Sequence, residues 1–418
     1  MGNDKKILVY ADWQDLENAQ LMGVLHASSL RGKEVLSFEY DKKWLKSGFT
    51  QKIDPDLELF EGFQYVREGK NNFGIFLDSS PDRWGRVLME RRETILAKIE
   101  NRQRKTLSET DFLLGVFDEQ RVGALRFKTE ANGEFQNNNK NFATPPFSSI
   151  KELERASYNL ENELIENDDE TLKWLNLLLA PGSSLGGARP KAGVIDENGE
   201  LWIAKFPSQN DVCDVGAWEM VVNELAQNAG LKVAKATAAK FYGKHHTFLS
   251  KRFDRTANGK RIHFASAMTL LGYNDGANFQ DGASYLEIVE FILQNGANID
   301  ADLQELFRRI AFSVCVKNTD DHLRNHGFLL AKNGWTLSPA FDINPNPKGT
   351  GLKLNISEND NSLDFNLLMD VALFFRISIK DAEQIINKIR KTVSNWQKIA
   401  LKYKISKEEQ KYMSSAFE

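Results

Sequence analysis

The sequence has few cysteines and no long apolar segment. Its 418 residues include two cysteines, Cys213 and Cys315, which form no CxxC pair. This excludes a disulfide framework and fits a reducing compartment. Apolar runs such as Val371–Phe375 are far shorter than the roughly 20 residues that a membrane-spanning helix needs. We therefore expect a cytoplasmic protein without a membrane partner.

A strong net charge is also missing. The chain has 54 Lys and Arg against 58 Asp and Glu, a formal charge of −4 at pH 7. This balance argues against a surface that binds nucleic acid or anionic membrane over its whole extent. Hydrophobic residues make up 41% and charged residues 27%, near the average for globular proteins, which excludes a disordered chain and a coiled coil.

Strand patterns dominate the middle of the chain, and helical patterns dominate its end. Short apolar runs bounded by turn residues predict strands at residues 6–11, 21–25, 35–40, 192–195, 201–206, 233–242, 247–252, 326–330 and 335–337. Apolar residues at helical spacing predict helices at residues 82–104, 150–166, 170–179, 215–229, 303–317 and 382–396. Ser80 is the expected N-cap of the first helix, while Asp214 and Gly230 are expected to bound the fourth.

One polar segment separates the parts of the chain. Residues 128–149 are rich in Asn and contain Pro145-Pro146, which is typical of a linker. We predict an α+β protein with an N-terminal subdomain at residues 1–127, the linker at 128–149, a strand-rich part at 150–255 and a helical part at 256–418.

The most informative segment follows the helix that runs toward residue 317. Asp320 and Asn325 are five residues apart, as are the Asp and Asn of the protein-kinase catalytic loop. A predicted hairpin then leads to Asp342. In such a site the first Asp orients the attacking hydroxyl, and the Asn and second Asp bind Mg²⁺ together with nucleotide phosphates. Because Asn-Thr-Asp-Asp is also common turn composition, this spacing needs support from other segments.

A glycine-rich loop precedes the first predicted hairpin of the strand-rich part. The backbone at Gly186 and Gly187 can approach a phosphate closely, because glycine has no side chain. The loop matches neither a Walker A motif nor a clean G-x-G-x-x-G, so a flexible surface turn is the alternative.

Three further features follow in the order found in protein kinases. Lys205 lies in an apolar strand, and Glu219 lies in the next helix, like the Lys–Glu pair of kinases. Arg252 and Phe253 end a strand where the adenine hinge is expected. Lys205 could instead point outward from an edge strand. The order of all these parts nevertheless favours an ATP-dependent kinase.

These motifs resemble the HipA family of serine/threonine kinase toxins from bacterial toxin–antitoxin modules. The resemblance covers nearly the whole chain and is carried by Phe38–Asp41, Leu77–Arg86, Ser183–Ala188, Ala204–Pro207, Arg252–Arg255, Asn318–Asn325 and Ala340–Asp342. It implies a protein-kinase-like two-lobed fold with a β-rich N-terminal lobe, an additional N-terminal subdomain and a C-terminal lobe dominated by helices. The glycine loop, lysine strand and hinge then fall within residues 150–255, and the catalytic loop and metal-binding Asp within 256–418.

The resemblance also implies residue roles. The catalytic role falls on Asp320, the Mg²⁺ ligands on Asn325 and Asp342, and the ATP contacts on Lys205, Gly186, Gly187, Arg252 and Phe253. Ser184 matches the serine that the family autophosphorylates to inactivate the kinase, and Ser183 is a rival position. His322 is a candidate for supporting the catalytic loop through hydrogen bonds.

Partners follow from the same resemblance. The family's usual partner is a small helix-turn-helix antitoxin that binds operator DNA and the kinase together, and characterised members phosphorylate aminoacyl-tRNA synthetases. Two alternatives stay open: a small-molecule kinase on the same scaffold, and a kinase-shaped corepressor that acts by binding the antitoxin on DNA. The chain departs from the family at Arg189-Pro190, where Gln-Glu is usual.

Overall fold

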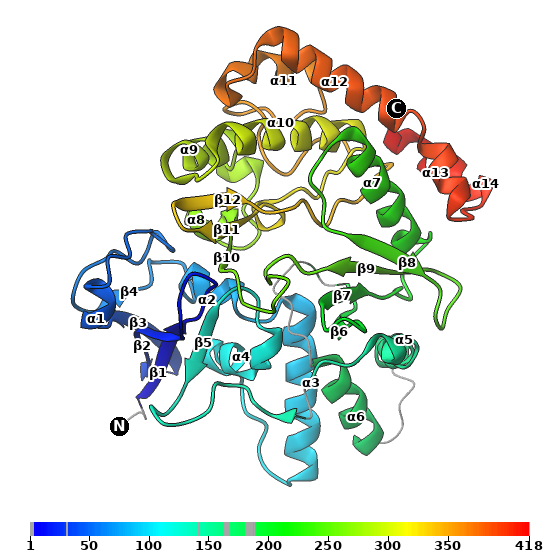
Figure 1. The fold of residues 1–418 in the computed structure, drawn as a ribbon. Coiled ribbons are helices and arrows are strands. Elements are labelled where there is room, and N and C mark those ends of the chain that lie inside the picture. The colour runs from blue at the N-terminus through cyan, green and yellow to red at the C-terminus, as the bar shows by residue number, and fades with distance from the viewer. Residues whose placement is uncertain are drawn as a thin grey trace. The chain divides into compact units, whose positions relative to one another are not determined.

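The computed structural model describes residues 4–417 except 31, 141–142, 163–167, 180–186 and 188. The chain forms two compact units (Figure 1). Unit 1 contains residues 1–209 and 254–265, and unit 2 contains residues 210–253 and 266–418. The segment predicted as one strand-rich part, 150–255, therefore contributes to both units. The domain boundaries inferred from the sequence remain a prediction.

Unit 1 contains a five-stranded antiparallel sheet in the order β4-β3-β2-β1-β5. Its strands are β1 (Lys5–Ala11), β2 (Gln20–Leu30), β3 (Lys33–Tyr40), β4 (Gln64–Tyr65) and β5 (Leu125–Lys128). In β1, Ile7, Val9 and Ala11 are fully buried, which is the period-two pattern of a strand with one face in the core. The first three predicted strands are confirmed.

Helices and a hairpin complete unit 1. They are α1 (Lys42–Leu45), α2 (Gly74–Asp78), α3 (Arg83–Ile99), α4 (Glu109–Gly115), η1 (Asp118–Gln120), η3 (Phe147–Ser149), α5 (Ile150–Glu161), α6 (Asp168–Leu179) and the antiparallel hairpin β6 (Lys191–Ile195)–β7 (Leu201–Lys205). The predicted cap of α3 is wrong. Asp82, rather than Ser80, caps the helix by accepting a hydrogen bond from the Gly85 amide at 2.9 Å. Ser80 instead donates its hydroxyl to the Phe76 carbonyl.

Unit 2 is mainly helical. Its helices are α7 (Val215–Ala229), α8 (Ala267–Leu270), η4 (Phe279–Asp281), α9 (Tyr285–Asn295), α10 (Ile299–Cys315), η5 (Leu323–Asn325), α11 (Phe365–Asp370), η6 (Ala372–Phe375), α12 (Ile379–Val393), α13 (Trp396–Lys402), α14 (Lys407–Met413) and η7 (Ser414–Phe417). Its hairpins are β8 (Ala236–Ala239)–β9 (Thr247–Lys251) and β11 (Gly327–Ala331)–β12 (Gly334–Leu337), both antiparallel. Strand β10 (Phe264–Ser266) lies where the chain passes from unit 1 to unit 2.

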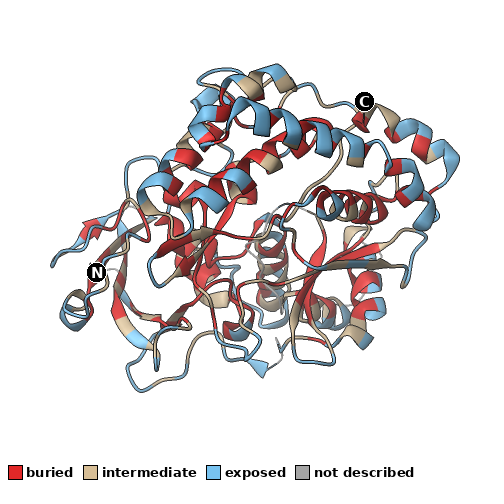
Figure 2. Cartoon of the chain, turned by 45° about the horizontal axis from the view of Figure 1, so that its top comes forward, coloured by how far each residue is buried: buried red, intermediate tan, exposed pale blue. Residues whose placement is uncertain are grey.

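Helix α10 carries much of the core of unit 2. Leu303, Leu306, Phe307, Ile310 and Ala311 are fully buried, as their helical spacing predicts. Figure 2 shows in red how the buried residues follow the helices and strands. In the described residues, no helix combines the length and hydrophobicity needed to cross a membrane.

Helix α7 has the predicted ends and an additional support. The Asp214 side chain accepts from the Ala217 amide, and Gly230 ends the helix at φ +94°. Glu409 of α14 accepts from the Asp214 amide at 2.5 Å and from the Trp218 indole at 3.1 Å. Trp218 also packs against Trp396 and Phe417, with ring centroids 5.8 Å apart in both pairs. Residues near position 410 therefore stabilise a helix that begins at residue 215.

Candidate active site

The predicted catalytic loop lies at the end of α10, in unit 2. Asp320 is exposed, whereas the next residue, Asp321, is buried. Neighbouring carboxylates of the same type thus have different environments. The exposed one is accessible to an acceptor hydroxyl, and the buried one is held by the protein interior.

Asp321 anchors the loop to the helices below it. Its carboxylate accepts from the Tyr285 hydroxyl at 2.7 Å and from the Ser313 hydroxyl at 3.3 Å, and it lies 3.0 Å from Nε2 of His326. Burial alone would raise the pKa of Asp321, but the contact with His326 and the hydrogen bonds lower it below its ordinary value. Asp321 is therefore expected to be an anion that fixes the backbone beside Asp320.

Asn325 is oriented by the same loop. Its amide nitrogen donates to the Asp320 carbonyl at 3.1 Å, and it is 5% exposed. Its side-chain oxygen is buried and has no hydrogen-bond partner among the described residues. A buried acceptor without a donor is costly unless a ligand satisfies it. The oxygen is thus suited to bind a cation.

Asp342 is brought to this loop by a set of asparagines. The Asn344 amide nitrogen donates to Asp342 Oδ1 at 2.9 Å, while its backbone N–H donates to Asn318 Oδ1 at 3.1 Å. Asn346 adds a bond of 2.8 Å to Thr319 Oγ1. Asp342 itself has φ +56°, a left-handed conformation that is unfavourable for most side chains. Residues 342–346 and 317–325 consequently form one connected structure.

The predicted hinge lies beside this structure. The rings of Phe253 and Phe341 are 5.5 Å apart, so the hinge residue packs against the neighbour of Asp342. Arg252 is buried, at 4% exposure. Both belong to unit 2 together with Glu219, which is also buried.

His322 contributes to the loop through its backbone. Its amide donates to the Asp320 carbonyl at 2.9 Å, and its carbonyl accepts from the Asn325 amide at 2.8 Å. The ring Nδ1 is buried without a hydrogen-bond partner among the described residues. Loop support by the His322 side chain remains a prediction.

The glycine loop and the lysine strand belong to unit 1. Ser183, Ser184 and Gly186 lie outside the described residues. Gly187 is exposed and has φ +81°, a conformation that favours glycine. Lys205 ends β7 and is 7% exposed, which disfavours the alternative of an outward-pointing edge residue.

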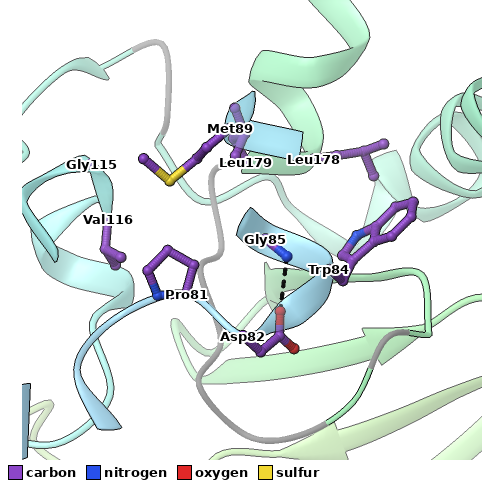
Figure 3. Close-up of a pocket in the computed structure, with 9 residues that line it drawn as sticks. All are labelled: Pro81, Asp82, Trp84, Gly85, Met89, Gly115, Val116, Leu178 and Leu179. Carbon is purple, nitrogen blue, oxygen red and sulfur yellow. Dashed lines mark hydrogen bonds between the residues drawn. The ribbon is translucent and has the colours of Figure 1, made fainter. Parts of the chain in front are cut away.

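A small pocket lies in unit 1 at the start of α3. Figure 3 shows the residues that line it, which are Pro81, Asp82, Trp84, Gly85, Met89, Gly115, Val116, Leu178 and Leu179. Most of this lining is apolar, and Asp82 is turned toward the Gly85 amide. None of the predicted site residues that the structure describes lines it.

Sequence reasoning missed the residues that hold the loop. Asp321 was inconspicuous beside Asp320, and Tyr285, His326 and Asn344 lie outside the kinase spacing. The available signal for Asp321 was the pair of adjacent aspartates, because two neighbouring carboxylates in one turn rarely have the same function. Their separate functions become visible only with burial.

The donor set fits a magnesium ion. Mg²⁺ prefers hard oxygen ligands and usually binds one or two protein groups plus phosphates and water. Asn325 offers an oxygen that no described residue hydrogen-bonds, and Asp342 offers a carboxylate with one oxygen already oriented by Asn344. Among the described residues, no cluster of three or more His, Cys, Asp or Glu could hold a metal ion. The present set is different in composition, because it consists of one Asn and one Asp.

Comparison with known proteins identifies the family. Residues 183–396 match the family described as HipA-like C-terminal domain, and the chain belongs to this family. A putative kinase of Haemophilus influenzae is 30% identical over 188 residues, which are 40% of this chain and 54% of that protein. This chain thus spans about half the length of that curated relative.

The fold is also found in solved structures. HipA from Shewanella oneidensis MR-1, in the complex of a toxin–antitoxin system with HipB and its operator DNA, superimposes with a TM-score of 0.67 at 16% identity, over 98% of this chain and 94% of that one. The proinflammatory kinase CtkA of Helicobacter pylori gives a TM-score of 0.38, over 54% of this chain and 88% of CtkA. The match to the Shewanella structure confirms the predicted α+β, protein-kinase-like two-lobed fold.

Proposed function

We propose that this protein is an ATP- and Mg²⁺-dependent serine/threonine protein kinase that acts as the toxin of a toxin–antitoxin module. One observation carries the catalytic part of the proposal. The loop with Asp320 and Asn325 is hydrogen-bonded through Asn318 and Asn344 to the segment with Asp342. This arrangement supports a phosphoryl-transfer site, in which an acceptor-orienting Asp and two oxygen ligands must be close together.

Each residue has a chemical task in this proposal. Asp320 is exposed, so its carboxylate can orient the acceptor hydroxyl and accept its proton. Asn325 and Asp342 hold Mg²⁺, which supplies neutralisation of the phosphate charge when bound. Lys205 binds ATP phosphates, with Glu219 as the possible partner of its ammonium group, and Arg252 and Phe253 contact adenine. Gly186 and Gly187 contribute backbone N–H groups to the phosphates.

Regulation and partners extend the proposal. Ser184 is the proposed autophosphorylation site, with Ser183 as its rival. A phosphate on the loop adds about −1.5 to −2 charge and would repel the nucleotide phosphates. The fold of the Shewanella HipA structure, which contains HipB and operator DNA, supports a small helix-turn-helix antitoxin as partner and DNA contact mainly through it. An aminoacyl-tRNA synthetase is the proposed protein substrate.

Replacement of the second aspartate tests the catalytic proposal. Asp342→Asn is expected to abolish phosphate transfer from ATP and to weaken Mg-ATP binding in isothermal titration, because it removes the negative charge that the Asp342 carboxylate contributes to the proposed Mg²⁺ ligands. Asp370→Asn is the matched control, since Asp370 is an exposed aspartate at the end of α11 in the same unit. Full activity of Asp342→Asn would refute the metal assignment.

Three further experiments test the alternatives and the proposed autophosphorylation. Phosphoproteomics of cells that express wild type or Asp320→Asn should identify proteins phosphorylated only by the active form; phosphorylation of a metabolite alone would favour the small-molecule kinase. Mass spectrometry after incubation with Mg-ATP should place a phosphate on Ser184. If Asp320→Asn is as toxic as wild type and represses the operator equally, the corepressor alternative is favoured.

A further inference from the structure

A buried ion pair joins the beginning of α3 to the beginning of β6. Lys191 Nζ lies 2.6 Å from Asp82 Oδ2, and the side chains of both residues are 2% exposed. The two positions are 109 residues apart in sequence. Asp82 belongs to the Leu77–Arg86 motif, for which the proposed function has no task. A buried pair of this kind is stable only when both charges stay satisfied.

The lysine of this pair faces the proposed ATP-binding lysine. In the β6–β7 hairpin, Lys191 is the register partner of Lys205. Residues directly opposite in an antiparallel pair project to the same face, with Cβ atoms about 4.5–5.5 Å apart. Two ammonium groups on one face repel each other, and Asp82 supplies the countercharge for one of them.

Lys191 also holds the end of the glycine loop. Its ammonium group donates to the Gly187 carbonyl at 3.0 Å. On the other side, the Pro190 carbonyl accepts from the Phe206 amide at 2.9 Å, which extends the hairpin by one bond. The hairpin therefore fixes the backbone of Lys191, and the hydrogen bond from the Lys191 side chain positions Gly187.

Asp82 is itself held in place by α3. One carboxylate oxygen accepts from the Gly85 amide at 2.9 Å (Figure 3). The other oxygen contacts Lys191. The helix thus orients the carboxylate, and a single side chain joins the helix N-terminus to the hairpin.

The geometry points to Asp82 as a positioning residue for the nucleotide site, acting through Lys191 on Gly187. Asp82 neutralises Lys191 and so keeps its ammonium group on the Gly187 carbonyl. Lys205 is then the lysine that binds the negatively charged phosphates. The inference rests on the proposed function, because it assumes that Gly187 and Lys205 bind ATP. It adds a positioning residue from the N-terminal subdomain to that site.

Charge removal at position 82 is the direct test. Asp82→Asn retains an oxygen for the Gly85 amide but places a neutral amide against Lys191. We expect the KM for ATP to rise about tenfold with a much smaller change in kcat, since the acceptor site in unit 2 is untouched. Lys191→Arg should behave like wild type, because a guanidinium can donate to both Asp82 and Gly187.

A double variant excludes simple unfolding. Asp82→Asn with Lys191→Met removes both charges and shortens only the lysine side chain, by one atom, so the thermal midpoint should recover toward wild type while the KM stays high. Glu109→Gln is the matched control, because it breaks the bidentate pair between Arg86 of α3 and Glu109 of α4 without touching Lys191. The control should leave the KM unchanged. A wild-type KM in the double variant would overturn the inference.

Amide exchange tests the pair without any activity. In nucleotide-free protein, the amides of Gly187, Arg189 and Lys191 should exchange faster in Asp82→Asn and in the double variant than in wild type or Glu109→Gln. Unchanged exchange would refute the positioning role. If wild-type protein binds no ATP, the proposed function fails, whereas the exchange experiment still decides whether Asp82 orders Gly187.

Discussion

Two regions of the molecule solve the same electrostatic problem in different ways. In unit 2, Asp320 and Asp321 are adjacent in sequence, and in unit 1, Lys191 and Lys205 face each other across a hairpin. In each region, interior groups bind one of the like charges. Asp321 is bound by two hydroxyls and a histidine, and Lys191 by a full carboxylate and a carbonyl.

The difference lies in what the bound charge positions. Asp321 fixes the backbone next to Asp320, so it positions a residue that is its neighbour in sequence. Lys191 fixes a residue four positions earlier and depends on a carboxylate 109 residues away. Under the proposed function, one member of each pair of like charges is structural, while the other acts on the ligand.

Alanine at the exposed aspartate gives the largest expected effect. Asp320→Ala should lower turnover by about 10²–10⁴-fold, the usual contribution of a positioned proton acceptor. Stability should stay within about 0.5 kcal/mol of wild type, because the side chain is exposed. Steady-state kinetics and urea unfolding measure both. Full turnover would place the acceptor-orienting group elsewhere.

Alanine at the buried neighbour should reverse that pattern. Asp321→Ala leaves His326 and the Tyr285 hydroxyl without their carboxylate in the interior, and we expect a loss of about 3–5 kcal/mol of unfolding free energy. Urea denaturation measures the change. A loss below 1 kcal/mol, on the scale of a single neutral hydrogen bond, would show that Asp321 does not anchor the loop.

Another buried aspartate, Asp54, extends the comparison to the pH dependence of stability. Asp54 in unit 1 is 1% exposed, and burial raises its pKa to about 6, although the Asp56 and Ile75 amides donate to it. Because the folded pKa exceeds the unfolded value, this stabilisation is complete below about pH 4 and is lost as the pH rises through 6. Relative to Asp54→Asn, wild type should lose about 3 kcal/mol between pH 4 and pH 7. Unfolding titrations of both proteins at several pH values measure this difference.

The Asp321 carboxylate should show the opposite pH dependence. Its folded pKa is lowered, so its stabilisation is present above the ordinary aspartate pKa and is lost as the pH falls through the folded value. The stability difference between wild type and Asp321→Asn should therefore shrink on acidification. A parallel slope for the Asp54 and Asp321 variants would mean that burial alone sets both pKa values.

The smallest expected effect concerns Asn344, whose side chain donates a hydrogen bond to Asp342. Asn344→Ala removes the donor to Asp342 Oδ1 but keeps the backbone bond to Asn318. One neutral hydrogen bond contributes about 1 kcal/mol, which corresponds to a roughly fivefold loss of Mg²⁺ affinity in the ATP complex. Titration of activity with Mg²⁺ measures it. No change would show that Asp342 is oriented by its backbone alone.

Features that depend on neighbouring residues could be predicted from the sequence. Asp214 and Gly230 bound α7 as expected, because a cap and a left-handed terminal glycine act within a few residues. The order of the kinase-like motifs likewise predicted the family and the fold, both of which the comparisons show.

Other features could not be read from local patterns. Ser80-Pro81 looked like a helix start, but Asp82 caps α3, and its second oxygen is used by Lys191. Helix α4, whose capping box begins at Ser108, was not predicted, since its seven residues are too short for a clear helical period. The pairing of Asn318 with Asn344 depends on tertiary structure alone.

The contacts of Glu409 with the start of α7 have a consequence for biosynthesis. The N-terminal turn of α7 and the Trp218 ring are completed by groups that are translated almost 200 residues later. Contacts of such long sequence separation form only after the intervening chain is available. A ribosome-bound nascent chain that has extruded residues 1–400 therefore still lacks part of the support for the helix with Glu219. We expect unit 2 to reach its native packing only when residues 407–417 have left the exit tunnel.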